Sequence, residues 1–307
     1  MKRNIYIYSK LWMIFFVLMG TACTNQVEDA IPVSGQPIEF SVQSDWKEIP
    51  NTRSNAGKTQ FKDSDSIQIF GFHTSSSGAV KKFMYRVNEP ARGQIVAYDG
   101  KDWNYSPKRF WPKEGTLDFY VSYPHYSVLN DEKNHKMTYE QTINPLQLDL
   151  LWGLATNRNC VTECKDTVKI WMVHALAKVN IIFDSSLGDI KQAKVSAYKA
   201  GDFSNAADNG VPLWNVDKTS DKNIQEATFS PYQDHPKIGD ATVFILPDRI
   251  KGLILTRLDG KVIDVSDKIQ NLTFEAGKVY NLTISKGVQK KNTNSRSIAM
   301  SVRCVSE

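Results

Sequence analysis

The sequence predicts an all-β fold, arranged as two β-sandwich domains in tandem. Short runs rich in Ile, Val, Tyr and Phe recur along the chain, and each is bounded by Gly, Pro, Asn or Asp, as short strands joined by turns require. The apolar spacing of an amphipathic helix is not sustained for three turns anywhere. A chain of 307 residues has room for two ordinary domains. Together these observations favour sandwiches over a parallel α/β sheet.

Residues 1–22 are predicted to be a secretory signal peptide. Positive charges at the start precede an uncharged run at 11–19, and small residues then lead to Cys23. The run is too short to span a bilayer as a stable helix. A Cys directly after small residues is what lipoprotein processing needs, although Gly20 stands where the usual lipobox has Leu. We therefore predict that Cys23 is lipidated and anchors the mature chain to the outer membrane; the alternative is ordinary secretion with a free Cys23.

The segment at 23–56 is expected to be a polar tether that carries one strand, at 38–42. The first sandwich domain is predicted at 57–165, with irregular crossover loops at 127–156. Its expected strands lie at 66–72, 83–87, 94–98, 103–106 and 117–123.

The second sandwich domain is predicted at 166–287, and 197–207 could hold one short helix. Its expected strands lie at 167–172, 176–183, 194–198, 227–229, 241–246, 252–257, 261–265 and 278–284.

Residues 288–307 combine a polar linker with one terminal strand. Its apolar positions alternate with Ala, Ser and Arg, and they are Ile298, Met300, Val302 and Cys304. A single strand on a flexible linker is not stable by itself, so it must add to the edge of a sheet. It is either the last strand of the second domain or a donor strand that completes another subunit.

Charge and cysteine content narrow the classes of function. Loss of the signal lowers the net charge from +5 to about +2, which excludes the basic footprint of a nucleic-acid-binding protein. With Cys23 acylated, an odd set of cysteines remains in an oxidising compartment. Cys160 and Cys164 favour a small loop disulfide or free thiols, and pairing among these two and Cys304 is left open. No second ligand pair accompanies them, so no zinc site is expected.

No motif in the sequence indicates catalysis, a cofactor or a metal. His174 precedes an apolar strand and is expected to be a hydrogen-bonded structural residue. Asp63, Asp65, Glu114 and Asp118 are expected to lie in turns or on outward strand faces rather than as a catalytic carboxylate pair. Absent motifs make an enzyme improbable but do not disprove one, because catalytic triads assemble from distant positions.

An aromatic concentration allows a second function, glycan binding by a surface lipoprotein that does not polymerise. We expect most of these rings to fill the core between sheets, with only one of Phe119 and Tyr120 facing inward. Trp111, before Pro112, is expected to be a core anchor at a bend. The rings concerned are Trp103, Tyr105, Phe110, Trp111, Phe119, Tyr120, Tyr123 and Tyr126.

Several segments, in order, resemble the fimbrillin family of Bacteroidales pilus and adhesin subunits. They are DSIQIFGF at 65–72, WNYSP at 103–107, FWP at 110–112, LDFYVSYP at 117–124, DLLWG at 149–153, HALAKV at 174–179 and FEAGKVYNL at 274–282. The order and rough spacing agree over most of the mature chain.

The resemblance implies two transthyretin-like Greek-key sandwiches and a non-enzymatic role at the outer surface, as a lipoprotein or within a fimbrium. The implied partners are other fimbrillin-like subunits, with glycans or proteins of host or bacterial surfaces as adhesion targets. In pilus-forming members, proteolysis after an Arg releases the first strand, and the vacated groove accepts a strand from another subunit. The matching position here is Arg53, followed by Ser54.

Overall fold

The computed structural model describes residues 31–44, 61–125, 127–131, 135–140, 149–206, 212–230, 241–286 and 300–306. Over these residues the chain is almost entirely β-structure, which confirms the predicted fold class. The first half contains β1 (Val33–Pro37), β2 (Phe40–Ser44), β3 (Ser66–Thr74), β4 (Val80–Met84), β5 (Gln94–Tyr98), β6 (Trp103–Asn104), β7 (Phe110–Pro112), β8 (Thr116–Tyr123), β9 (Val128–Asp131), β10 (Lys136–Glu140), β11 (Leu151–Asn159) and β12 (Val168–His174).

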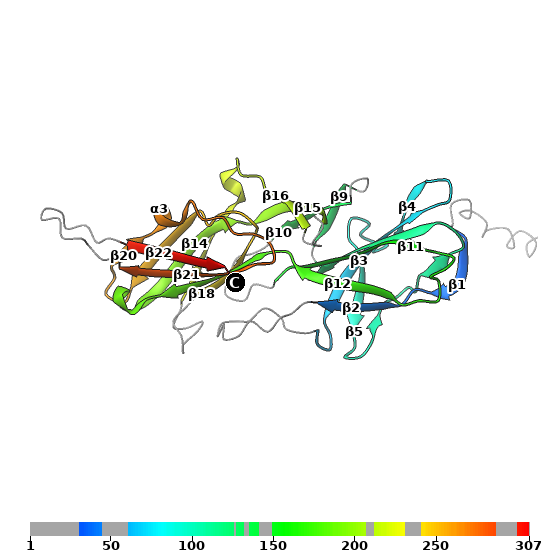
Figure 1. The fold of residues 1–307 in the computed structure, drawn as a ribbon, viewed down its shortest axis with the longest axis horizontal. Helices are drawn as coiled ribbons and strands as arrows, with labels where there is room; N and C mark the ends of the chain where they lie inside the picture. Colours follow the sequence, from blue (N-terminus) through cyan, green and yellow to red (C-terminus); the bar gives the residue numbers. More distant parts are fainter. Residues whose placement is uncertain are drawn as a thin grey trace, which may run out of the picture.

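The second half contains β13 (Ala177–Phe183), β14 (Ile190–Tyr198), β15 (Ala200–Ala206), β16 (Pro212–Asn215), β17 (Ile224–Phe229), β18 (Ala241–Ile245), β19 (Gly252–Arg257), β20 (Val262–Asp264), β21 (Val279–Lys286) and β22 (Met300–Ser306). The described helical turns are η1 (Ser185–Leu187), η2 (Asp221–Asn223) and α3 (Ser266–Ile269). Figure 1 shows an elongated molecule with β1 at one end and β20 toward the other. None of the described helices is long and apolar enough to cross a membrane.

One large sheet organises the first half of the molecule. Its strand order is β2-β12-β11-β8-β3-β5-β6, and β4 adds to β3. The two ends of this order, β2 and β6, contact each other. The sheet therefore curls around a core, so that its two ends enclose the side chains of its middle strands. β2 pairs with β12 in parallel, and the short β1 pairs with β7 in a separate two-stranded sheet.

The central strands of this sheet are buried on both faces. Phe119 belongs to the core inside the curled sheet, whereas the next residue, Tyr120, belongs to a second core on the opposite face. Both rings are essentially inaccessible. As expected, only Phe119 faces the core inside the curled sheet. Tyr120 is nevertheless buried, because a further layer of strands covers the outer face.

That layer is a sheet built from both halves of the chain, in the order β16-β15-β10-β9. β10 pairs with β15 from Met137↔Phe203 to Glu140↔Ala200, and the ring of Phe203 packs edge-on against Trp152, with centroids 5.0 Å apart. Two predictions are corrected here. Residues 128–131 and 136–140 form strands rather than only crossover loops, and 200–206 is a strand rather than a helix.

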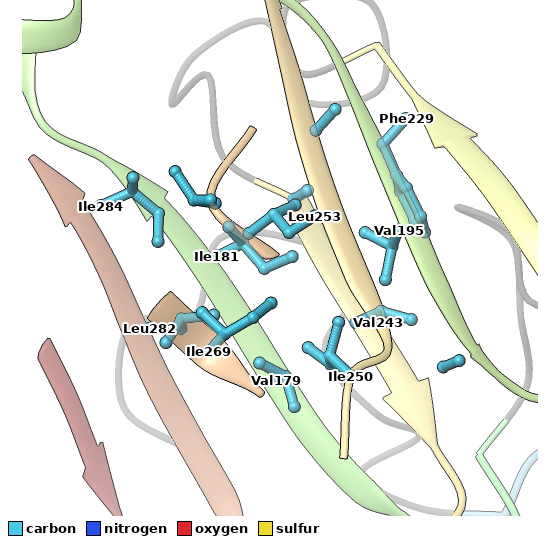
Figure 2. Packing of buried hydrophobic residues seen from close by; sticks show 14 of the residues in the cluster. Val179, Ile181, Val195, Phe229, Val243, Ile250, Leu253, Ile269, Leu282 and Ile284 are labelled. Atoms are coloured by element: carbon cyan, nitrogen blue, oxygen red, sulfur yellow. The ribbon is translucent and has the colours of Figure 1, made fainter. Parts of the chain in front are cut away.

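The second half is a sandwich of two four-stranded sheets, β18-β13-β21-β22 and β17-β14-β19-β20. Figure 2 shows how Ile181 of β13 and Leu282 of β21 pack against Val195 of β14 and Leu253 of β19, which belong to the opposite sheet. These side chains are fully buried. Alternate residues of each strand point inward, as the period of two requires, so one continuous apolar core holds this half together.

The boundary between the halves differs from the prediction. The sequence predicts a strand at 167–172 in the second domain, but the observed strand, β12, pairs with β11 and β2 in the large sheet of the first half. The chain passes into the second sandwich only after His174, where β13 pairs with β18 and β21. The apolar run from β12 into β13 is nearly continuous in sequence, so it gave no sign of the change of sheet.

Candidate functional site

The first strands of the chain complete the core of the first half. Ile38, Phe40 and Val42 are 0%, 6% and 8% exposed and belong to the core cluster inside the curled sheet. The Phe40 ring packs edge-on against Phe119, with centroids 5.3 Å apart. A segment that lies before position 53 therefore supplies three apolar side chains at a spacing of two residues to a core built by later strands.

Polar contacts also hold this segment in place. The Tyr105 hydroxyl donates to the carbonyl oxygen of Ile38 at 2.8 Å, and the Ile38 N–H donates to the carbonyl oxygen of Arg109 at 2.9 Å. Burial raises the pKa of Tyr105 to about 12. Because the folded state favours the neutral phenol, the stability contribution from Tyr105 ionisation is complete below pH 10 and is lost as the pH rises through 12. The bond is thus intact at physiological pH.

The predicted lipidation and cleavage positions, Cys23, Arg53 and Ser54, lie outside the described residues. The structure brackets the cleavage position: β2 ends at Ser44, and the description resumes at Phe61. Phe61 then packs edge-on against Trp103, with centroids 4.8 Å apart. Arg53 therefore falls between β2 and Phe61, two described parts of the chain that both pack on this core.

The terminal strand lies in the sheet of its own chain. β22 pairs antiparallel with β21, with Val302 opposite Ile284 and Cys304 opposite Leu282. Cys304 is partly buried against the core of the second half. This is the arrangement expected of a last strand in its own domain, and β22 occupies the outer position of that sheet. Ile298 lies outside the described residues, and the donor role of this strand stays a prediction.

The aromatic concentration is mostly core, as predicted. The rings of Trp103, Tyr105, Trp111, Phe119, Tyr120 and Tyr123 are buried. Phe110 is 38% exposed, and Tyr126 lies outside the described residues. Trp111 is fully buried in the core of the first half, which confirms it as an anchor. Sequence reasoning missed Trp171, which is 54% exposed.

His174 is a hydrogen-bonded residue at the junction of the two halves. Its Nδ1 contacts Oδ2 of Asp149, a buried carboxylate 25 residues earlier in the sequence. The sequence offered no neighbouring carboxylate to pair with His174, although both residues lie in segments that resemble the fimbrillin pattern. The pair joins the end of β12 to a residue two positions before β11, which indicates a structural role for this histidine.

The carboxylates considered for catalysis serve separate turns. Asp65 accepts the Lys62 N–H at 2.5 Å, Glu114 accepts the Ser76 hydroxyl at 2.6 Å, and Asp118 accepts the Asn157 N–H at 2.7 Å. Within the described ranges, no group of three or more His, Cys, Asp or Glu side chains is placed to hold a metal ion.

Cys160, Cys164 and Cys304 are free thiols in the structure, which is one of the two alternatives for Cys160 and Cys164. Burial is the main cause that raises the pKa of Cys160 to about 12. The Cys164 thiol donates to the Val161 carbonyl oxygen at 3.3 Å. A thiol with so high a pKa is a poor nucleophile at neutral pH, so Cys160 behaves as a core residue.

Comparison with known proteins identifies a family and several structures that this chain resembles. A family model described as fimbrillin-like matches residues 52–299; that range excludes β1, β2 and β22. No curated protein matches the chain. The chain is similar to the crystal structure of a proposed cell adhesion protein from Bacteroides uniformis, with 18% identity, a TM-score of 0.53, and coverage of 89% of this chain and 98% of that one. A proposed cell adhesion protein from Bacteroides ovatus shows 15% identity, a TM-score of 0.50, and coverage of 88% and 95%.

Proposed function

The chain belongs to the fimbrillin-like family, and from that premise we propose that it is a non-enzymatic subunit of a cell-surface pilus or adhesin. It assembles by exchange of β-strands between copies or with related subunits. The precursor is anchored to the outer membrane through Cys23, and cleavage after Arg53 frees the segment that contains β1 and β2. The groove left beside β12 then accepts the terminal strand of another subunit.

This proposal rests on the matching spacing of apolar residues in two segments: the first segment, which leaves after cleavage, and the terminal segment, which replaces it. The leaving segment places Ile38, Phe40 and Val42 into the core at alternate positions. The terminal segment offers apolar residues with the same period of two, at 298, 300, 302 and 304. Since alternate residues of a strand face the same side, the second segment can refill the positions that the first vacates, and backbone hydrogen bonds to β12 supply the rest of the affinity.

The energetics explain why the vacated groove must be refilled. Burial of one Ile, Phe or Val side chain contributes about 1.5–3 kcal/mol, so loss of the three side chains costs about 5–9 kcal/mol as an upper estimate. That is comparable with the whole stability of a typical domain, about 5–15 kcal/mol. A cut subunit is therefore strongly driven to capture a replacement strand.

The terminal strand is in a suitable position to leave its own sheet. β22 has a single neighbour, β21, among the described strands, whereas the central strand β13 has two. An outer strand gives up one ladder of hydrogen bonds when it detaches, and an equivalent ladder forms in the partner's groove. The exchange thus conserves pairing while it links two chains.

Light scattering of two soluble forms tests the proposal. The mature chain 23–307 with Cys23→Ala should remain monomeric, because β2 fills the groove. The chain 54–307 should form multimers whose size increases with concentration. Monomeric 54–307 at concentrations where a folded domain is still present would contradict strand exchange, and circular dichroism would establish that the domain is folded.

A further inference from the structure

An open groove of about 750 Å³ lies beside β2. Residues 39–44 line it without interruption, together with residues at the end of β5 and the start of β6, and with Thr167 and Trp171 next to them in the sheet. β2 pairs with β12, and no other described strand pairs with it. The groove has the volume of an ordinary small-ligand site, about 300–1,000 Å³.

Trp171 gives this groove an accessible aromatic face. Its neighbours on β12, Ile170 and Met172, are buried in the core, so the alternation of the strand turns the indole outward. Trp171 lies opposite Gln43 of β2 in the parallel register. Trp is highly buried on average, whereas this indole is 54% exposed and lines the groove, so its face is available to a ligand.

The side chains around the indole can donate and accept hydrogen bonds. Ser41, Gln43 and Thr167 line the groove, and in the described part of the chain none of these side chains has a hydrogen-bond partner. The charges at the rim have both signs: Glu39 is paired with Lys108 at 3.2 Å, and Lys101 with Asp102 at 3.8 Å. Such a rim does not select a ligand of either charge.

We propose that this groove binds a neutral oligosaccharide. A sugar ring has an apolar face of C–H groups that stacks on an indole, and a rim of hydroxyls that pairs with hydroxyl and amide side chains. Those are the two kinds of group that Trp171 and its neighbours Gln43 and Thr167 provide. The inference rests on the adhesive part of the proposed function and is independent of polymerisation.

The position of the groove has a consequence for cleavage. Residues 39–44 precede Arg53, so a chain that has lost its first segment has also lost one side of the binding site. Glycan binding is therefore a property of the uncut chain, because the strand that replaces β2 in a polymer brings other side chains to this side of the groove.

A glycan array followed by calorimetry tests the site in the chain 23–307 with Cys23→Ala. The array should carry neutral and acidic oligosaccharides, and the strongest neutral binder is then titrated. Trp171→Ala should weaken binding at least about tenfold, which corresponds to about 1.4 kcal/mol, and Trp171→Phe should weaken it less. Leu213→Ala is the matched control, because Leu213 is similarly exposed, at 57%, on the distant strand β16. The chain 54–307 should not bind.

Four results would overturn the proposal: no neutral glycan above background, equal affinity of the Trp171→Ala variant and the parent chain, binding of acidic glycans only, or binding by the chain 54–307 as strong as that of the uncut chain. If instead a peptide of residues 296–307 bound in a manner that depended on Trp171, with no glycan signal, the groove would be a strand-docking site. Because all four results are measured as glycan binding rather than as multimer size, any of these failures leaves the light-scattering result for 54–307 unaffected.

Discussion

Replacement of both Met300 and Val302 by Asp should abolish multimers of the chain 54–307. In the proposed exchange, these residues occupy apolar positions in the partner's groove, where a carboxylate would be buried without a partner. A loss of about 3 kcal/mol weakens association by more than about a hundredfold. Sedimentation velocity at matched concentrations measures the change.

The matched control adds the same charge at the alternating positions of the strand. Ser301→Asp with Val305→Asp should still permit multimers, since Val305 is 44% exposed in the structure. Multimers of normal size from the Met300 and Val302 double variant would contradict the donor role. Equal loss of multimers in both double variants would show that charge alone blocks association, whatever the register.

Removal of the first segment should destabilise the donor-deficient chain, and a peptide should restore its stability. With Met300→Asp and Val302→Asp in both forms, residues 54–307 should unfold with about 5–9 kcal/mol less free energy than residues 23–307 with Cys23→Ala, because three core side chains are missing. A wild-type peptide of residues 296–307 binds only the folded chain and should raise the melting temperature with its concentration. Urea and thermal denaturation give both quantities.

A peptide that carries the same two Asp substitutions is the control for this rescue. It should leave the melting temperature unchanged. If the two chain lengths were equally stable, Ile38, Phe40 and Val42 would contribute little to the core, and the groove would have no need of a replacement strand.

The sequence predicted the strands better than it predicted their neighbours. Patterns of alternation found β3, β8, β13 and β21 close to their observed bounds, because each has an apolar face that must be buried. The sheet of β9, β10, β15 and β16 could not be predicted, since its central pairing joins residues about 60 positions apart and no local pattern encodes such a partner. For the same reason, the sequence could not show that β12 belongs to the large sheet of the first half.

The candidate sites divide in the same way. The terminal strand and the segment at 38–42 were evident from alternation and from their place beside polar linkers. Trp171 was overlooked because it lies within an apolar strand, where a Trp is expected to be buried. The alternation of the strand did indicate its exposure, because Trp171 lies on the same face as Lys169, which is exposed. Asp149 could not be identified from the sequence as the partner of His174, because the two residues become neighbours only in the folded chain.

Mass spectrometry of the protein taken from the native outer membrane tests the central claim most directly. The same sample is run without boiling, to show whether it migrates as a ladder. Strand exchange after cleavage predicts an N-terminus at Ser54 together with a ladder of multimers. An acylated N-terminus at Cys23 with a single monomeric band would contradict it, and would leave an uncut lipoprotein whose surface function does not involve polymerisation.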